Sequence, residues 1–144
     1  MAENLTNWQK LAEIYKKIDK ERGSWSNDTI EFSITVKLAE MIAKDDIAFM
    51  AVTSEPKNEG ENMHVDFAVA QKEKKDYFVF FPDGETAVKM NMKFFACSTA
   101  QALEFVLKTK DIAGIQLIYD VDEKNFSYSM GEITKKMAVV AMSK

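Results

Sequence analysis

Histidine and cysteine, the residues best suited to nucleophilic or metal chemistry, occur once each in this chain of 144 residues, as His64 and Cys97. A structural zinc site of the Cys/His type needs four such ligands, so the composition excludes one. Cys97 ends an apolar segment just before a predicted helix. A buried, inert thiol is the expected state there, and a reactive thiol whose pKa is lowered by the helix is the alternative. His64 is expected at an exposed strand edge rather than as a catalytic base.

Three kinds of functional motif are either incomplete or missing. Ser54 and Lys57 have the spacing of a Ser-x-x-Lys nucleophile, but that motif needs a helix and Pro56 lies between them. Segment 120–125 resembles the start of a calcium loop, yet Asn125 stands where glycine is required. The five glycines form neither a Gly-x-Gly-x-x-Gly pattern nor a P-loop. We therefore expect no catalytic residues, no metal and no cofactor, and a protein that is not an enzyme.

The polar side chains best placed to bind a ligand are Asp83, Glu85 and Asp120, which follow two predicted strands. Asp83 is also suited to cap the helix that Glu85 enters. Glu85 then either completes this cap or points at a ligand, and we favour the structural role. Trp8, on an N-terminal helix, and Trp25, in a short loop, are candidates for contact with a partner because tryptophan often anchors interfaces. Packing is the default expectation for both.

Composition and charge narrow the class of protein. Hydrophobic residues make up 47% of the chain and charged residues 29%, which is typical of a globular domain with one core. The net charge is -4 and the lysines are interspersed with acids, so nucleic-acid binding is not expected. Apolar runs are far shorter than the roughly 20 residues that cross a bilayer. With no signal peptide evident and one cysteine, we expect a cytoplasmic protein without membrane or nucleic-acid partners.

Helical spacing of apolar residues predicts a first amphipathic helix over 4–22, ended by Gly23. The segment 29–43 is compatible with two structures. Its apolar residues alternate as in a strand, but they also fit one helical face that Asn27 or Asp28 would cap. Because the segment is long for a strand, the sequence favours a helix.

The rest of the chain alternates between apolar segments and polar turns. Strands are expected at 47–53, 64–70, 76–81, 93–97, 114–119 and 125–129, with a polar loop at 54–62 and a hairpin turn at 71–75. Helices are expected over 82–90, 100–108 and 130–137, and the type of the apolar run 138–142 is left open. This mixture predicts a single α+β domain, in which a mixed, partly antiparallel sheet is flanked by helices and preceded by the N-terminal helix.

An ordered pattern over 46–137 resembles the N-terminal domain of the SseB-like family, the enhanced serine sensitivity proteins of bacteria. Residues 77–87 (YFVFFPDGETA) are similar to the family's aromatic strand running into Phe-Thr-Ser/Asp-x-Glu-x-Ala. Residues 112–120 (IAGIQLIYD) are similar to its Ala-Gly and apolar strand before Asn-Pro. Pro82 departs from the usual Thr, and Tyr-Asp at 119–120 stands where Asn-Pro is commoner.

The resemblance implies an SseB-like α+β domain at 46–144, with an N-terminal helical extension at 1–45 packed on or beside it. The family carries no established catalytic residues, so the resemblance implies fold and lineage without chemistry.

Three functional hypotheses follow. The leading one is a non-catalytic bacterial module that binds or regulates protein partners or associates with itself, with helix 4–22 as a possible contact. The alternative is a domain that senses or binds a small molecule through Asp83, Glu85 and Asp120. An enzyme that uses Cys97 ranks third.

Overall fold

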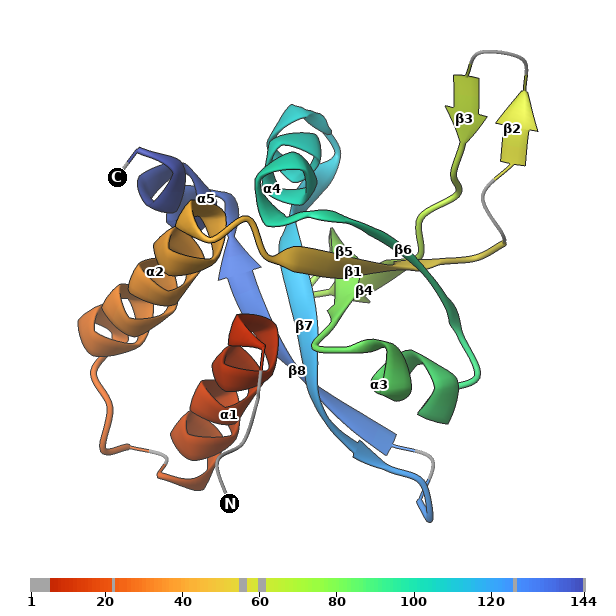
Figure 1. Ribbon diagram of the computed structural model, residues 1–144. Helices are drawn as coiled ribbons and strands as arrows, with labels where there is room; N and C mark the ends of the chain where they lie inside the picture. The colour runs from red at the N-terminus through yellow and green to blue at the C-terminus, as the bar shows by residue number, and fades with distance from the viewer. Residues whose placement is uncertain (1–5, 22, 55–56, 60–61, 126, 144) are drawn as a thin grey trace.

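The computed structural model describes residues 6–21, 23–54, 57–59, 62–125 and 127–143. The helices in these residues are α1 (Asn7–Lys20), α2 (Asn27–Ala43), α3 (Gly84–Lys89), α4 (Thr99–Lys108) and α5 (Lys135–Met142) (Figure 1). The strands are β1 (Ile47–Val52), β2 (Lys57–Glu59), β3 (Asn62–His64), β4 (Val69–Lys72), β5 (Lys75–Phe81), β6 (Lys93–Ser98), β7 (Ile112–Asp122) and β8 (Ser127–Thr134). No helix in the described ranges has the length and apolar character needed to cross a membrane.

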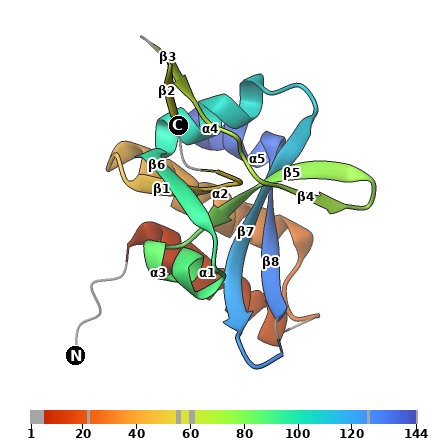
Figure 2. The ribbon, with the colours of Figure 1, turned by 90° about the vertical axis from the view of Figure 1, so that its right-hand side faces the viewer.

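Six strands form one mixed sheet in the order β6-β1-β5-β7-β8, and β4 pairs with the N-terminal part of β5. β5 and β7 are parallel neighbours at the centre, while the other named pairs of this sheet are antiparallel. β2 and β3 form a separate hairpin that projects from the body (Figure 1). Figure 2 shows β7 and β8 as a long curved hairpin. The expected α+β class with a mixed sheet is confirmed.

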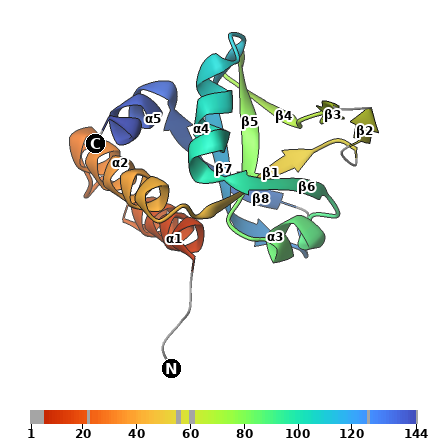
Figure 3. The ribbon, with the colours of Figure 1, turned by 45° about the horizontal axis from the view of Figure 1, so that its top comes forward.

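The two faces of the sheet are covered unequally. Helices α1, α2, α4 and α5 pack on one face and enclose the larger core, whereas the short helix α3 covers the other (Figure 3). Side chains of β5 alternate between the two, so Phe80 faces the larger core and Phe81 the smaller one. This double burial explains why β5 is an almost continuous run of apolar residues. Trp8 of α1 and Leu38 of α2 belong to the same core as the sheet.

Each of these helices begins at a side chain that accepts a backbone N–H of its first turn. The capping residues are Thr6, Ser26, Asp83, Ser98 and Thr134. The preference for a helix over 29–43 is confirmed, but its cap is Ser26 rather than Asn27 or Asp28. Ser26 has the extended backbone that an N-cap requires, with φ -77° and ψ 157°.

Two predicted elements are wrong. The expected strand 64–70 is split, because β3 ends at His64 and β4 begins only at Val69. Between them the chain bonds to β1, where the Ala68 N–H donates to the Ala51 carbonyl at 2.9 Å. The expected loop 54–62 likewise contains β2.

The expected helix 130–137 is also wrong over most of its length. Residues up to Thr134 extend β8, which pairs with β7 along its length. The helix starts only at Lys135, and the undecided run 138–142 belongs to it. Pairing with a strand distant in sequence outweighs the local helical spacing of these residues.

Candidate functional site

Helix α1 is fixed to the sheet by a buried hydrogen-bond chain at its N-terminal end. The Trp8 indole N–H donates to Thr99 Oγ1 at 3.0 Å, and the Thr99 hydroxyl donates to the Asp46 carbonyl at 2.9 Å. Asn7 Nδ2 also donates to the Asp46 carboxylate at 2.6 Å. Trp8 has an exposed fraction of 0%. Because its indole fills the core, Trp8 presents no surface to a partner. The structure therefore does not support Trp8 as a contact residue.

The middle of α1 is fixed to the β7–β8 hairpin. The Tyr15 ring stacks on Tyr119 with centroids 5.8 Å apart, and its hydroxyl donates to the Glu132 carbonyl. Burial raises the pKa of Tyr15. Gly131 makes this approach possible, since a Cβ atom there would lie 2.3 Å from the Tyr15 ring.

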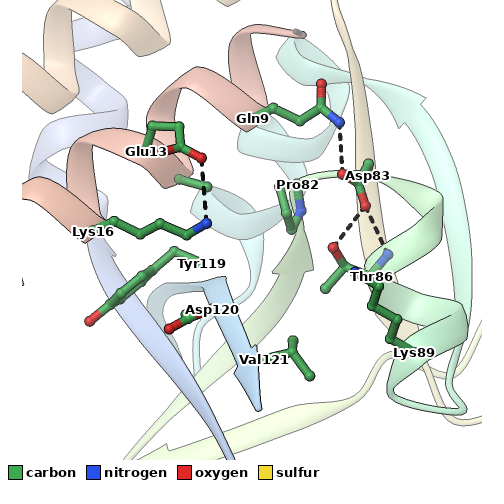
Figure 4. Close-up of a pocket in the computed structure, with 11 residues that line it drawn as sticks. Gln9, Glu13, Lys16, Pro82, Asp83, Thr86, Lys89, Tyr119, Asp120 and Val121 are labelled. Atoms are coloured by element: carbon green, nitrogen blue, oxygen red, sulfur yellow. Dashed lines mark hydrogen bonds and ion pairs between the residues drawn. The ribbon is translucent and has the colours of Figure 1, made fainter. Parts of the chain in front are cut away.

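A polar groove lies between α1, the start of α3 and the end of β7 (Figure 4). Its inner part is a cavity of about 260 Å³ lined by Gln9, Ala12, Glu13, Lys16, Pro82, Asp83, Thr86, Lys89, Tyr119, Asp120 and Val121. A second hollow of about 670 Å³ continues along α1 and shares Glu13, Lys16, Tyr119 and Asp120 with it. The structure thus brings together two of the three predicted ligand residues, Asp83 and Asp120.

Asp83 is held by hydrogen bonds to both of its carboxylate oxygens. One oxygen accepts the backbone N–H of Thr86 at 2.8 Å and the Thr86 hydroxyl at 2.7 Å, and the other accepts Gln9 Nε2 at 2.7 Å. Partial burial acts to raise the pKa of Asp83, but these bonds and the charge of Lys89 together hold it below its ordinary value. The predicted capping role of Asp83 is confirmed. The same carboxylate ties α1 to α3.

The remaining charges of the groove have both signs. Lys16 Nζ lies 3.4 Å from Glu13 Oε1 on α1, while Asp120 is exposed on β7 and Lys89 is exposed at the end of α3 (Figure 4). A small molecule with both a cationic and an anionic group would find charges of opposite sign within one hollow.

Glu85 lies outside this groove. Its side chain is exposed, and it lines a different hollow with Gly84, Val88, Lys89 and Phe94. The second candidate partner residue, Trp25, is half-buried after α1, where its indole N–H donates to Glu21 Oε1 at 3.2 Å. The structure does not bring Glu85 or Trp25 together with Asp83 and Asp120.

The candidates for covalent or metal chemistry are not supported by their surroundings. Cys97 is half-buried on β6, and burial raises the pKa of its thiol, so the expected alternative of a lowered pKa is wrong. The side chain of His64 lies outside the described residues. Asp122 closes the β7–β8 turn by accepting the backbone N–H groups of Lys124 and Asn125. Among the residues that are described, no three potential ligands gather to hold a metal ion.

A second surface, not predicted from the sequence, lies on the outer side of α2 and α5. Phe32 and Val36 of α2 and Val140 of α5 are exposed, and they line one shallow hollow of about 220 Å³ together with the polar residues Asp28, Glu31 and Thr35. We call Phe32, Val36, Val140 and Val139, which is exposed next to Val140 in the chain, the apolar strip. The signal in the sequence was the strict alternation of apolar residues over 30–38, which on a helix places them on two opposite sides.

Compared with models of known protein families, with curated proteins and with solved structures, the chain shows no significant match. The polar groove and the apolar strip are therefore the two features of the molecule that bear on its function.

Proposed function

We propose that this chain is a non-catalytic bacterial interaction or regulatory module of the SseB-like type, which acts by binding another protein chain. The observation that carries the proposal is the apolar strip. Phe32 exposes 67% of its surface, and Val36, about one helical turn later, is exposed beside Val140. Single exposed apolar side chains are common, whereas several that two packed helices bring to one hollow are more typical of an interface.

Neither the core nor helix formation explains the apolar strip. The opposite side of α2 already supplies Ile34, Leu38 and Met41 to the core. Phe32 and Val36 are also weaker helix formers than alanine or lysine, so an exposed position gains no helical stability from them. Contact with another chain accounts for their presence on the outer side.

The test is affinity capture of the tagged chain followed by quantitative mass spectrometry. We compare the wild type with a strip variant, Phe32→Lys with Val140→Lys, and with a matched control, Val88→Lys on α3. Val88 is 75% exposed, so its replacement is equally mild for the fold. Polypeptides captured by the wild type, further copies of this chain included, should be kept by the control and lost by the strip variant. The same set captured by all three proteins would contradict the proposal.

A second candidate function is the reversible binding of a small polar molecule, favoured by the meeting of Asp83 and Asp120 in one groove with Lys16. In a thermal-shift screen, a compound that binds the folded state raises the melting temperature. The shift should persist in Glu85→Gln, whose carboxylate lies outside the groove, and vanish in Asp120→Ala with Lys16→Ala. A screen of charged metabolites without any such shift would count against this candidate.

A further inference from the structure

Strand β7 continues past the end of its neighbour β5, and the polar groove lies along this continuation. The last pair between these parallel strands is Phe80 with Leu117, whereas β7 itself runs to Asp122. Beyond that pair, the space beside β7 is bordered by α1 and α3 (Figure 4). In open α/β sheets, ligands bind in the crevice beyond the carboxyl ends of parallel strands. The groove lies at the corresponding edge of this sheet.

A β-bulge in β7 directs two consecutive side chains into this space. The pairing with β8 passes from Ile118 directly to Asp120, so Tyr119 is an extra residue. The regular alternation is therefore broken, since Tyr119 packs on the larger core and Val121, two residues later, packs on the smaller one. Asp120 consequently lies on the same side as Tyr119, and both line the groove. Bulges that re-aim side chains in this way are common beside functional sites.

Contacts within the protein already fix the walls of the groove. The Tyr119 ring is stacked on Tyr15, whose hydroxyl donates in turn to a backbone carbonyl of β8. Across the groove, the Asp83 carboxylate accepts hydrogen bonds from Gln9 of α1 and from Thr86 of α3. A ligand would therefore have few side chains to order on binding, which lowers the entropic cost of association.

The uncompensated charge of the groove is negative. Lys16 Nζ lies 3.4 Å from Glu13 Oε1, and the charges of Lys89 and Asp83 attract each other. Asp120 is exposed, and within the described residues its carboxylate takes part in no hydrogen bond or ion pair. A cationic group of a ligand is the natural partner of this carboxylate, because a charge-assisted hydrogen bond is among the stronger polar contacts.

A third hollow adjoins the groove and is more apolar. It has a volume of about 390 Å³, shares Lys89 and Val121 with the groove, and is also lined by Met90 of α3 and Tyr128 of β8. Tyr128 exposes 51% of its surface. The acids at 122–123 also line this hollow, and acidic residues outnumber lysines by seven to four over the three hollows. The whole surface therefore favours a ligand that is both cationic and partly apolar.

We propose that these hollows bind a small amphipathic amine, whose cationic group pairs with Asp120 and whose aromatic or branched aliphatic part packs against Val121 and Tyr128. The ring of Tyr119 lies next to Asp120 in the wall and adds a π surface for the cation. This inference rests on small-molecule binding, the second candidate function, and names the class of molecule.

The test is an amide NMR titration of the full chain with phenylbutylamine and with its shorter homologue phenylethylamine, which differ in the reach from nitrogen to ring. At least one of them should shift the amide signals of residues 119–122 and of Tyr128 in a saturable way. Replacing the amine of the tighter binder by a hydroxyl or a carboxylate should raise the dissociation constant at least about tenfold, since the pairing with Asp120 is lost. Butylamine and ethylamine, which lack the ring, should be weaker by a similar factor.

Variants assign the two ends of the ligand, and circular dichroism first shows each variant to be folded. Asp120→Asn should raise the dissociation constant of the phenyl amine at least about tenfold and abolish its preference over the alcohol. Tyr128→Ser should weaken the amine about fivefold and keep that preference, because it removes only apolar contact. Glu85→Gln, an exposed carboxylate outside the three hollows, is the matched control and should change neither value.

The outcomes separate this inference from the function on which it rests. An amine that binds no better than its alcohol, or equally well to Asp120→Asn, overturns the proposal. A carboxylate that binds more tightly than the amine and shifts residues 119–122 keeps small-molecule binding and overturns the class of molecule. If none of these compounds binds and the screen of charged metabolites is also flat, both the amine proposal and the small-molecule function are overturned.

Discussion

Helices α1 and α2 lie side by side on one face of the sheet, yet they relate to solvent in opposite ways. α1 buries Trp8, Leu11 and Tyr15, and it exposes its lysines, Glu13 and Asp19. α2 buries Leu38 and its neighbours, and it also exposes Phe32 and Val36. A helix whose only role is to pack against the core needs a single apolar side. The difference shows that α1 builds the fold and one wall of the groove, and it is the basis on which we propose α2 as the binding helix.

The largest expected effect comes from removing the side chain by which α1 packs into the core. Trp8→Ala should lower the free energy of unfolding by about 3–5 kcal/mol, because it leaves a cavity in the core and removes the donor to Thr99. The measurement is urea unfolding followed by circular dichroism. Trp25→Ala is the matched control and should cost less than about 1 kcal/mol, since Trp25 is only half-buried. Equal losses from both substitutions would contradict a structural role specific to Trp8.

A smaller effect is expected where α1 touches β8. Gly131→Ala should cost about 1–3 kcal/mol, because the added methyl group overlaps the Tyr15 ring. In a Tyr15→Ala background the same change should cost little, since the ring is gone. A double-mutant cycle by urea unfolding measures this coupling. Costs that are the same in both backgrounds would show that the contact does not position α1.

The smallest effect concerns the bond from α1 to α3. The pKa of Asp83 is lowered in the folded state, so its carboxylate stabilises the fold above its unfolded pKa of 3.8. That contribution is lost as the pH falls through the lower folded pKa. Wild type should therefore lose more stability on acidification than Asp83→Asn, which keeps a capping side chain.

The measurement is urea unfolding at neutral pH and at two acidic pH values, one just above and one below the unfolded pKa of Asp83. Glu85→Gln is the control and should follow the wild type. A parallel decline in wild type and Asp83→Asn would show that Asp83 does not contribute through its charge.

Local signals in the sequence were enough for some of these features. The α+β class, helix α1 and the Asp83 cap all follow from spacing and capping residues close together in the chain. The same kind of signal favours a helix over 29–43, and the alternation of apolar residues over 30–38 places them on two sides of that helix. The sequence could not tell which side would face the core, because that depends on the sheet beneath it.

Other features depend on contacts between distant residues. The sequence predicts a strand over the start of β8 but a helix over residues 130–134, because their pairing with β7 is not encoded in local periodicity. Asp83 and Asp120 share a groove only because α1 packs across both, with Gln9 bonded to Asp83 at 2.7 Å. The burial of Trp8 likewise depends on Thr99, which lies 91 residues further along the chain.

The most direct test of the contrast between the two helices is affinity capture with wild type, Phe32→Lys and the control Val88→Lys, each with its free energy of unfolding measured. The proposed binding role of α2 predicts that Phe32→Lys loses the polypeptides that the wild type captures while its free energy of unfolding stays the same. Val88→Lys should keep them. A Phe32→Lys protein that still captures the same polypeptides would contradict the proposed role of α2 as the binding surface.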